Sequence, residues 1–297
     1  MNKLFLCSFA SPDLKRSVVR FENQAKKMEI YEKIKVFGYN DLSIDKKNQI
    51  NNFFKIKQKR LYGYGSWKAF IIRSFLDQVP ENSILQYSDI GCHLNLKGIT
   101  RLKEYVQLCN EKSILTFQYK KPDFKNFYKF NFQEYYEYQY TKGDVWRFLK
   151  IDDNSEILKS NQLWSGTIFF KNDRYSKEIL NEWSEFLNIS SLIDDSASLS
   201  QNHKDFVEHR HDQSLFSLIC KKRNVHSLSA SECEWAEINK SRTWEHAINF
   251  PIHAIRDKKY NFLKRFLNRQ KKNFKRIINN AKNLNVLCNK YGNFVLK

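Results

Sequence analysis

ILQYSDIGCHLN, residues 84–95, is the stretch that decides the fold. Its apolar start, Ile84 to Tyr87, is typical of a short buried strand, and Asp89 follows where such a strand would end. In an open α/β sheet, ligands bind beyond the carboxyl ends of the strands. A carboxylate there, close to the small Gly91, suits a sugar-bearing or metal-bound diphosphate. Asp and Gly are also ordinary turn formers, so a plain strand-ending turn is the alternative.

The segments before this stretch form a strand–helix–strand pattern. Residues 3–9 and 33–39 predict strands, and the apolar spacing over residues 14–28 predicts the helix between them. Such an opening implies a parallel sheet. The loop after the first strand then lies at the ligand edge, which makes Ser8 and Phe9 candidates to contact a nucleotide base or ribose.

The rest of the chain continues the alternation of strands and helices. Residues 120–140 interleave Phe and Tyr with charges of both signs, which indicates an irregular insertion or a lid, and residues 189–203 are typical of an exposed loop. Further strands are predicted over 113–119 and 161–170, and helices over 69–76, 98–110, 143–149, 172–187 and 215–220.

A glycine-containing loop precedes the helix predicted at residues 69–76. Gly65, Trp67 and Lys68 lie where backbone N–H groups at a helix N-terminus, with a lysine beside them, favour phosphate. The spacing is not that of a Walker loop. An ordinary loop before a core helix is the alternative.

Two later segments carry further candidate residues. His211 and Asp212 belong to a dense cluster of His, Arg, Asp and Gln directly before an apolar helix, where a purely structural segment rarely has such a composition. Asp212 also fits a plain helix cap. Ser165 and Gly166 interrupt the strand predicted at 161–170, and a glycine inside a strand often marks the close approach of a ligand or another backbone.

The net charge of +19 over 297 residues is spread unevenly. Residues 256–297 hold thirteen Lys and Arg against one acid, a net charge of +12, which leaves +7 for the first 255 residues. Residues 258–287 combine this charge with a periodic apolar side, a pattern that suits an anionic membrane surface. We therefore expect a catalytic body over 1–256 and a basic amphipathic helical tail over 257–297.

The cysteines and the apolar segments bound the compartment. The six cysteines show no C-x-x-C pair and irregular separations, which argues against a zinc ribbon and a secreted disulfide framework. No stretch reaches the roughly 18 apolar residues that a spanning helix needs. We expect reduced thiols and a cytoplasmic protein that lies at the inner face of the cytoplasmic membrane.

The basic charge and the many aromatic residues also admit two functions without catalysis. One is a nucleic-acid-binding protein, but no recognisable nucleic-acid module occurs and the charge is concentrated in the tail, so nucleic acid is not the expected partner. The other is a membrane-surface scaffold in which the sheet domain is inactive and the tail is the functional part.

Four segments together resemble bacterial glycosyltransferases of the GT-A fold, and most closely transferases that build capsular and surface polysaccharides. They are RLYGYGSWKAFII (60–72), ILQYSDIGCHLN (84–95), QLWSGTIFF (162–170) and EHRHDQSLFSLICKK (208–222). The resemblance covers residues 1–256. It implies a Rossmann-like nucleotide-binding half, a mixed sheet flanked by helices, and transfer of a sugar from a nucleotide sugar, with a UDP-sugar as the expected donor, to a capsular or lipooligosaccharide glycan or a lipid-linked glycan.

The resemblance also implies roles for individual residues. Asp89 matches the first acid of the Asp-x-Asp motif that carries Mn²⁺ or Mg²⁺ on the donor diphosphate, but Gly91 replaces the second acid. His253 stands where related transferases supply a late histidine ligand, so Asp89 with His253 is one possible metal site. Alternatively, Lys68 and Arg256 neutralise the leaving diphosphate without a metal.

The remaining roles concern the sugar and the acceptor. In an inverting enzyme, Asp212, with His211 as the second candidate, takes the proton of the acceptor hydroxyl. In a retaining enzyme the same aspartate would lie near the anomeric carbon. The candidates to bind substrate are Trp164, Ser165, Gly166 and Gln213.

Overall fold

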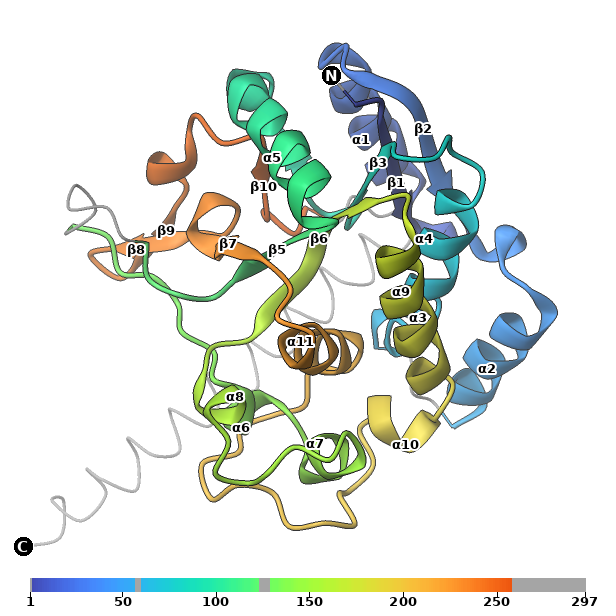
Figure 1. The fold of residues 1–297 in the computed structure, drawn as a ribbon, viewed down its shortest axis with the longest axis vertical. Helices are drawn as coiled ribbons and strands as arrows, with labels where there is room; N and C mark the ends of the chain where they lie inside the picture. The colour runs from blue at the N-terminus through green and yellow to red at the C-terminus, as the bar shows by residue number, and fades with distance from the viewer. Residues whose placement is uncertain (1, 57–59, 123–128, 258–297) are drawn as a thin grey trace, which may run out of the picture.

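One central sheet organises the chain (Figure 1), and the computed structural model describes residues 2–56, 60–122 and 129–257. The sheet has six strands in the order β2-β1-β3-β6-β5-β7. In chain order these are β1 (Leu4–Phe9), β2 (Tyr31–Phe37), β3 (Ile84–Ser88), β5 (Ile114–Gln118), β6 (Leu163–Lys171) and β7 (Ser227–Ser229).

Strand β6 alone runs against the other strands of this sheet. β1 pairs in parallel with β2 and β3, β5 pairs in parallel with β7, and β6 is antiparallel to both β3 and β5. The carboxyl ends of β1, β3 and β5 therefore meet the amino end of β6 at one edge of the sheet. Phe9, Asp89, Tyr119 and Trp164 lie at or just beyond these ends, so this edge collects side chains from four distant segments.

Helices α4 (Lys68–Leu76), α9 (Arg174–Leu187) and α11 (Asp212–Lys222) cover one face of the sheet and share its larger core. Helix α9 is amphipathic, because its buried apolar residues lie on one side. The side chain of Asp173 caps its first turn by accepting a hydrogen bond from the Ser176 N–H at 2.9 Å. The cap fixes where the helix begins, and the apolar side fixes how it packs.

Helices α1 (Lys15–Lys27) and α5 (Ile99–Lys112) cover the other face, where a second core forms (Figure 1). Because successive side chains of a strand point to opposite faces, Phe5 and Cys7 of β1 enter the larger core while Leu4 and Leu6 enter the second core. All six residues of β1 are buried, as expected for an inner strand covered on both faces.

The described chain has six further α-helices and four further strands. The helices are α2 (Ile44–Lys55), α3 (Leu61–Tyr64), α6 (Glu137–Tyr140), α7 (Gly143–Phe148), α8 (Glu156–Lys159) and α10 (Ser190–Ile193), and the strands are β4 (His93–Leu94), β8 (Ala236–Ile238), β9 (Ser241–Thr243) and β10 (Ile252–His253). β10 pairs with β4, and β8 pairs with β9, each antiparallel.

The predicted α/β architecture, a mixed sheet flanked by helices, is confirmed. One local expectation was incomplete: residues 189–203, predicted as an exposed loop, include α10, in which Leu192 and Ile193 are buried in the larger core. This apolar pair is too short to show a helical period, so the pattern alone could not indicate it. From residue 258 onward the predicted tail lies outside the described residues, and the boundary at residue 256 stays a prediction.

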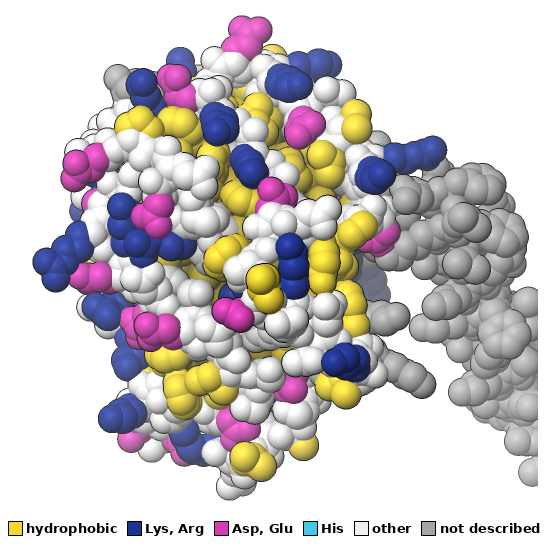
Figure 2. All heavy atoms as spheres, turned by 90° about the vertical axis from the view of Figure 1, so that its right-hand side faces the viewer, with side chains coloured by type: hydrophobic (Ala, Val, Ile, Leu, Met, Phe, Trp, Pro, Cys, Tyr) yellow, Lys and Arg dark blue, Asp and Glu magenta, His cyan; other side chains and the backbone are white. Residues whose placement is uncertain are grey.

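The face that carries α2 and α4 mixes charges of both signs. Figure 2 shows Lys and Arg side chains interspersed with Asp and Glu side chains on this face rather than gathered in one basic patch. None of the helices within the described ranges is long and apolar enough to cross a bilayer.

Candidate functional site

The site begins where β3 ends. Asp89 directly follows this strand, and its backbone N–H donates to the carbonyl oxygen of Gly166 in β6 at 2.8 Å. The last contact of the β3–β6 ladder therefore fixes the position of Asp89 against residues 165 and 166. The predicted place of Asp89, at the carboxyl end of a buried strand, is confirmed.

Lys68 joins Asp89 to Asp212 across this edge. Its ammonium Nζ lies 2.7 Å from Oδ2 of Asp212 and 3.4 Å from Oδ1 of Asp89. The side chains of Lys68 and Asp212 are only 6% and 4% exposed, whereas that of Asp89 is 45% exposed. The three residues, called here the Lys68 cluster, come from the start of α4, the end of β3 and the start of α11.

Ser165 completes the surroundings of the ammonium group. Lys68 Nζ also donates to the carbonyl oxygen of Ser165 at 3.3 Å and to its Oγ at 3.2 Å, and this hydroxyl in turn donates to Oδ2 of Asp212 at 3.0 Å. Burial alone would lower the pKa of Lys68, but the carboxylates of Asp212 and Asp89 outweigh burial and raise it. The lysine therefore stays protonated in a buried position.

Tyr87 holds Asp89 from the strand side. Its hydroxyl donates to Oδ1 of Asp89 at 2.6 Å, and its ring lies 5.2 Å from Lys68 Nζ. Burial first, and the Asp89 carboxylate second, raise the pKa of Tyr87 well above its usual value, so the hydroxyl keeps its proton. Only one oxygen of Asp89 has these partners, and the carboxylate faces solvent.

The loop before α4 is shaped around Asp212. Gly65 has φ +74°, and a Cβ built on it would lie 2.7 Å from Cγ of Asp212. Any other residue would meet both the strained backbone and the carboxylate. Asp212 is thus enclosed by the Gly65 backbone, by Lys68 and by Ser165, while the Trp183 indole N–H donates to its backbone carbonyl oxygen at 3.2 Å.

His211 lies beside the Lys68 cluster but points elsewhere. Its ring is 1% exposed, Nδ1 donates to the carbonyl oxygen of Ile193 at 2.7 Å, and Nε2 lies 3.8 Å from Oδ1 of Asp195. Burial lowers the pKa of His211, so its ring is neutral at pH 7. The role predicted for it as second proton acceptor stays a prediction.

The candidates for nucleotide contact at the end of β1 fall into two groups. Phe9 stacks on Trp67 with ring centroids 3.9 Å apart, which brings two predicted residues together. Ser8 is buried, and its hydroxyl has no hydrogen-bond partner within the described residues. Because side chains alternate along a strand, Ser8 faces the side of the sheet opposite to Phe9.

The predicted substrate-binding residues support the Lys68 cluster from β6 and α11. Gln213 accepts a hydrogen bond from the Ser165 N–H at 3.4 Å. Gly166 gives room to the indole of Trp164, because a Cβ on residue 166 would lie 2.2 Å from that ring. The close approach predicted from this glycine is thus made by a tryptophan side chain.

Gly91 and Arg256 lie side by side just after Asp89, and His253 of β10 pairs with His93 of β4. A Cβ on Gly91 would lie 3.1 Å from Cα of Arg256, so the glycine allows two backbones to pass closely. The Arg256 guanidinium pairs with Oε1 of Glu234 at 2.6 Å. Nε2 of His253 donates to the carbonyl oxygen of Ala247 at 2.7 Å, which commits that nitrogen to the backbone.

A divalent metal held by the protein does not fit these residues. Lys68 already places a positive charge between Asp89 and Asp212, and an ammonium group repels a metal ion at the same carboxylates. His253 turns Nε2 to a carbonyl oxygen, and the described residues contain no group of three or more His, Cys, Asp or Glu suited to a metal ion. The chemistry of this site is therefore assigned to its side chains and not to a metal ion held by them.

Two contributors were missed by the sequence analysis. Tyr87 stands two residues before Asp89, and the period of two in a strand places both side chains on one face, so this partner could have been found. Glu234, the partner of Arg256, follows a short 3₁₀ turn and carries no periodic or motif signal.

No protein-family model matches this chain, and no curated protein is similar to it in sequence. Several solved structures are similar in shape, three glycosyltransferases among them. A glycosyltransferase involved in the glycosylation of the major capsid of PBCV-1 has TM-score 0.46 and 9% identity, with 84% of this chain and 91% of that chain covered. Mouse xyloside xylosyltransferase 1 has TM-score 0.38 and 10% identity, with 78% and 87% covered.

The third structure is the glycosyltransferase GlyE of Streptococcus pneumoniae TIGR4, with TM-score 0.33, 13% identity, and 78% of this chain and 46% of that chain covered. With all three TM-scores below 0.5, these similarities carry no argument about activity. The residues of the site, and not these similarities, indicate the function.

Proposed function

We propose that this protein is a glycosyltransferase that takes a sugar from a nucleotide-sugar donor at the Lys68 cluster. The observation that carries the proposal is the buried Lys68 ammonium between Asp89 and Asp212 at the edge where β1, β3 and β5 end. Ligands of open α/β sheets bind at this edge. Three of the four segments that resemble the glycosyltransferases of the GT-A fold supply the residues of this cluster, and the fourth supplies Ser165 beside it.

The charge of the Lys68 cluster suits the sugar. Two carboxylates and one ammonium carry a net charge of −1, which favours the positive charge that develops at the anomeric carbon as its bond to the diphosphate breaks. Asp89 is the group that a ligand reaches, because its side chain is 45% exposed and one of its oxygens lacks the Tyr87 and Lys68 contacts. It accepts hydrogen bonds from sugar hydroxyls.

Asp212 acts through Lys68 in this proposal. Its carboxylate is 4% exposed and contacts Lys68 and Ser165, so it positions the ammonium group and the ammonium group positions Asp89. The direct transfer of a proton to Asp212, predicted from the sequence, would require the acceptor to enter past Lys68. If Asp212 positions Lys68 and takes up no proton itself, replacing Asp212 should still lower the rate of donor hydrolysis.

The finer parts of the proposal follow from the sequence. A UDP-sugar is the expected donor, and a capsular, lipooligosaccharide or lipid-linked glycan is the expected acceptor. The basic tail, which begins beyond the described residues, would hold the enzyme at the anionic inner face of the cytoplasmic membrane.

The test is donor hydrolysis by the full-length protein, measured with UDP-, GDP- and CMP-sugars. We expect slow release of nucleotide from at least one donor, and a loss of roughly 10²–10³-fold in Asp89→Ala and Asp212→Asn, as for the loss of one group that stabilises developing charge. Asp77→Asn is the matched control, because Asp77 pairs with Arg73 at the exposed C-terminal end of α4 and lies outside the Lys68 cluster. Circular dichroism checks that each variant folds.

Two results would contradict the proposal. One is that no nucleotide sugar is bound or hydrolysed by the wild-type protein. The other is that Asp89→Ala hydrolyses the donor at the rate of Asp77→Asn. Since the site does not fit a metal, we also expect hydrolysis to persist after treatment with EDTA.

A further inference from the structure

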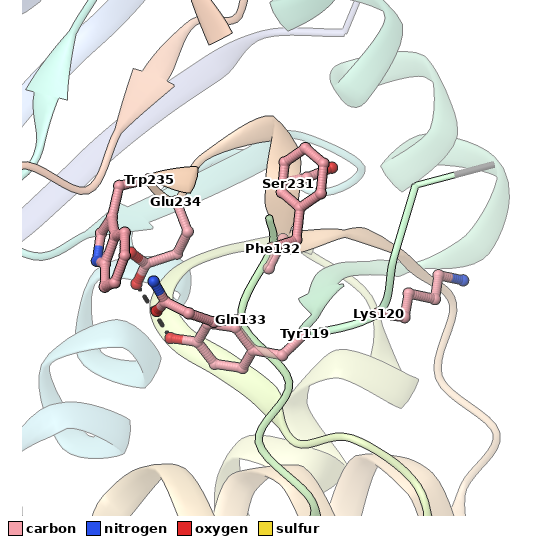
Figure 3. Close-up of a pocket in the computed structure, with 8 residues that line it drawn as sticks. Tyr119, Lys120, Phe132, Gln133, Ser231, Glu234 and Trp235 are labelled. Atoms are coloured by element: carbon pink, nitrogen blue, oxygen red, sulfur yellow. Dashed lines mark hydrogen bonds between the residues drawn. The ribbon is translucent and has the colours of Figure 1, made fainter. Parts of the chain in front are cut away.

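A small pocket lies at the same edge of the sheet, beyond the end of β5 (Figure 3). Tyr119 from the end of β5, Phe132 and Gln133 from the following segment, and Glu234 and Trp235 from the loop after β7 line it. In Figure 3 the polar groups of Tyr119, Gln133 and Glu234 converge, while the Lys120 side chain extends away. This set is called here the Glu234 pocket.

Three buried polar atoms of the Glu234 pocket have no hydrogen-bond partner within the described chain: Glu234 Oε2, Gln133 Nε2 and Trp235 Nε1. Glu234 is 2% exposed, and its Oε1 accepts from the Tyr119 hydroxyl at 3.0 Å and from Arg256, whereas its Oε2 is unpaired. Gln133 uses its Oε1 to accept from Tyr135, and its Nε2 is unpaired. A buried polar group without a partner costs about 1–3 kcal/mol, so this arrangement indicates a ligand.

The unpaired atoms define the chemistry of that ligand. Glu234 Oε2 requires a donor and Gln133 Nε2 requires an acceptor, and a hydroxyl group is both. A phosphate would be repelled by Glu234, and an ammonium group would meet the Gln133 donor and the Arg256 guanidinium. The free space inside is about 10 Å³, which is enough for the centre of one water-sized group.

The walls and the position of the pocket favour a carbohydrate. Aromatic rings of Tyr119, Phe132 and Trp235 line the pocket, but Tyr119 is buried and Arg242 covers the Trp235 ring at 4.1 Å, so the partly exposed Phe132 is the ring that the apolar face of a sugar would meet. Arg256 links the pocket to the Lys68 cluster, since it pairs with Glu234 while its backbone passes close to Gly91. Arg256 therefore joins the pocket to the turn that follows Asp89.

We propose that the Glu234 pocket binds one hydroxyl group of the carbohydrate acceptor, between Glu234 Oε2 and Gln133 Nε2. This inference rests on the proposed glycosyl transfer, which it deepens by naming where the acceptor is held. Only this hydroxyl enters the pocket, while the ring of the acceptor sugar lies outside it beside the partly exposed Phe132, and the pocket orients the ring toward the donor sugar at Asp89.

The test measures binding and donor hydrolysis separately on the full-length protein. Saturation-transfer NMR with a panel of methyl glycosides detects carbohydrate binding, and nucleotide release without acceptor reports on the Lys68 cluster. We expect at least one glycoside to bind, with affinity about three- to tenfold lower in Gln133→Leu and lower again in Glu234→Gln. Gln78→Leu, an exposed Gln on the opposite side of Asp89, is the matched control.

The outcomes separate the two proposals. Loss of glycoside affinity in both pocket variants, with donor hydrolysis unchanged, supports the pocket. Equal glycoside affinity in the wild type and both variants, or no glycoside binding by a protein that hydrolyses a donor, overturns the pocket and leaves the proposed function standing. Glycoside binding that depends on Gln133 and Glu234, in a protein that uses no nucleotide sugar, supports the pocket and overturns the glycosyltransferase.

Discussion

The Lys68 cluster and the Glu234 pocket with its partner Arg256 have the same three kinds of group, a carboxylate, a tyrosine and a cation. The cation is the buried charge in the first, and the carboxylate is the buried charge in the second. Each has a carboxylate that accepts from a tyrosine hydroxyl near the end of a strand, Tyr87 to Asp89 and Tyr119 to Glu234, and each has a cation. At the Lys68 cluster the cation is 6% exposed and Asp89 is 45% exposed. At the pocket Arg256 is 52% exposed and Glu234 is 3% exposed.

This reversal teaches which group of each set a ligand meets. A buried cation anchors an exposed carboxylate that is ready to contact a ligand from solvent. A buried carboxylate beside an exposed cation instead offers a single unpaired oxygen inside a small pocket. Matched substitutions at the Lys68 cluster and at the Glu234 pocket test this difference.

The largest contrast is expected between the two cations. Lys68→Met leaves Asp212 buried beside Asp89 without a positive charge, and breaking a buried ion pair costs about 3–5 kcal/mol. Arg256→Met should cost about 1–3 kcal/mol, because Glu234 keeps Tyr119 and can take up a proton. Urea unfolding measures both free energies, and an equal loss in the two variants would remove the distinction.

The next contrast concerns the two glycines that let backbones approach. Gly65→Ala should cost about 1–3 kcal/mol, because its Cβ would meet Asp212 at 2.7 Å on a backbone with φ +74°. Gly91→Ala should cost less, since its nearest contact is 3.1 Å and its φ is not in the left-handed region. Gly38→Ala, with a nearest contact of 3.8 Å, serves as control in thermal unfolding.

The two tyrosines should differ by less. Tyr119→Phe leaves buried Glu234 with one partner fewer, which costs about 1–3 kcal/mol, whereas water can replace the Tyr87 hydroxyl at the half-exposed Asp89. We therefore expect a larger loss of unfolding free energy in Tyr119→Phe than in Tyr87→Phe. The reverse order, measured by urea unfolding, would show that Asp89 is the less hydrated carboxylate.

The smallest effect is a pH dependence at the Glu234 pocket. Burial raises the pKa of Glu234 above its ordinary value of 4.5, so the folded state binds this proton more tightly than the unfolded state. The contribution of this proton to the free energy of unfolding is complete below pH 4.5. It is lost as pH rises through the pKa of Glu234 in the folded state, at no more than about 1.4 kcal/mol per pH unit.

Glu234→Gln removes that proton. The unfolding free energy of the wild type relative to Glu234→Gln should therefore fall between pH 4.5 and pH 7. A relative stability that rises over this interval would mean that Arg256 and Tyr119 outweigh burial and lower the pKa of Glu234.

Much of the fold followed from local patterns in the sequence. The first strands and helices were predicted because apolar spacing and strand ends are local properties, and Asp89 was placed correctly because a buried run followed by Asp and Gly marks a strand end. The sequence analysis named Lys68, Asp89 and Asp212 as separate candidates, and the structure brings the three together at one edge, although the chemical roles of these residues stay predictions.

The rest could not be predicted because it depends on pairing between distant segments. The antiparallel direction of β6 depends on the path of residues 119–162, which local patterns do not encode. The partners of the ammonium group depend on this direction, since Ser165 reaches Lys68 only because the amino end of β6 lies beside Asp89. The pairing of Glu234 with Arg256 joins two loops that carry no periodic signal.

The reversed strand has a consequence for how this fold can change. Gln118 at the end of β5 pairs with Leu163 at the start of β6, so the chain leaves and re-enters the sheet at neighbouring positions. The described residues between these two positions also return to the body of the protein, because Trp146 lies in the larger core and Glu137 pairs with Lys221 of α11 at 2.8 Å. An insertion at an exposed position of this segment would therefore change the surface near the Lys68 cluster without shifting a strand, whereas a change at Trp146 or Glu137 would also disturb α11.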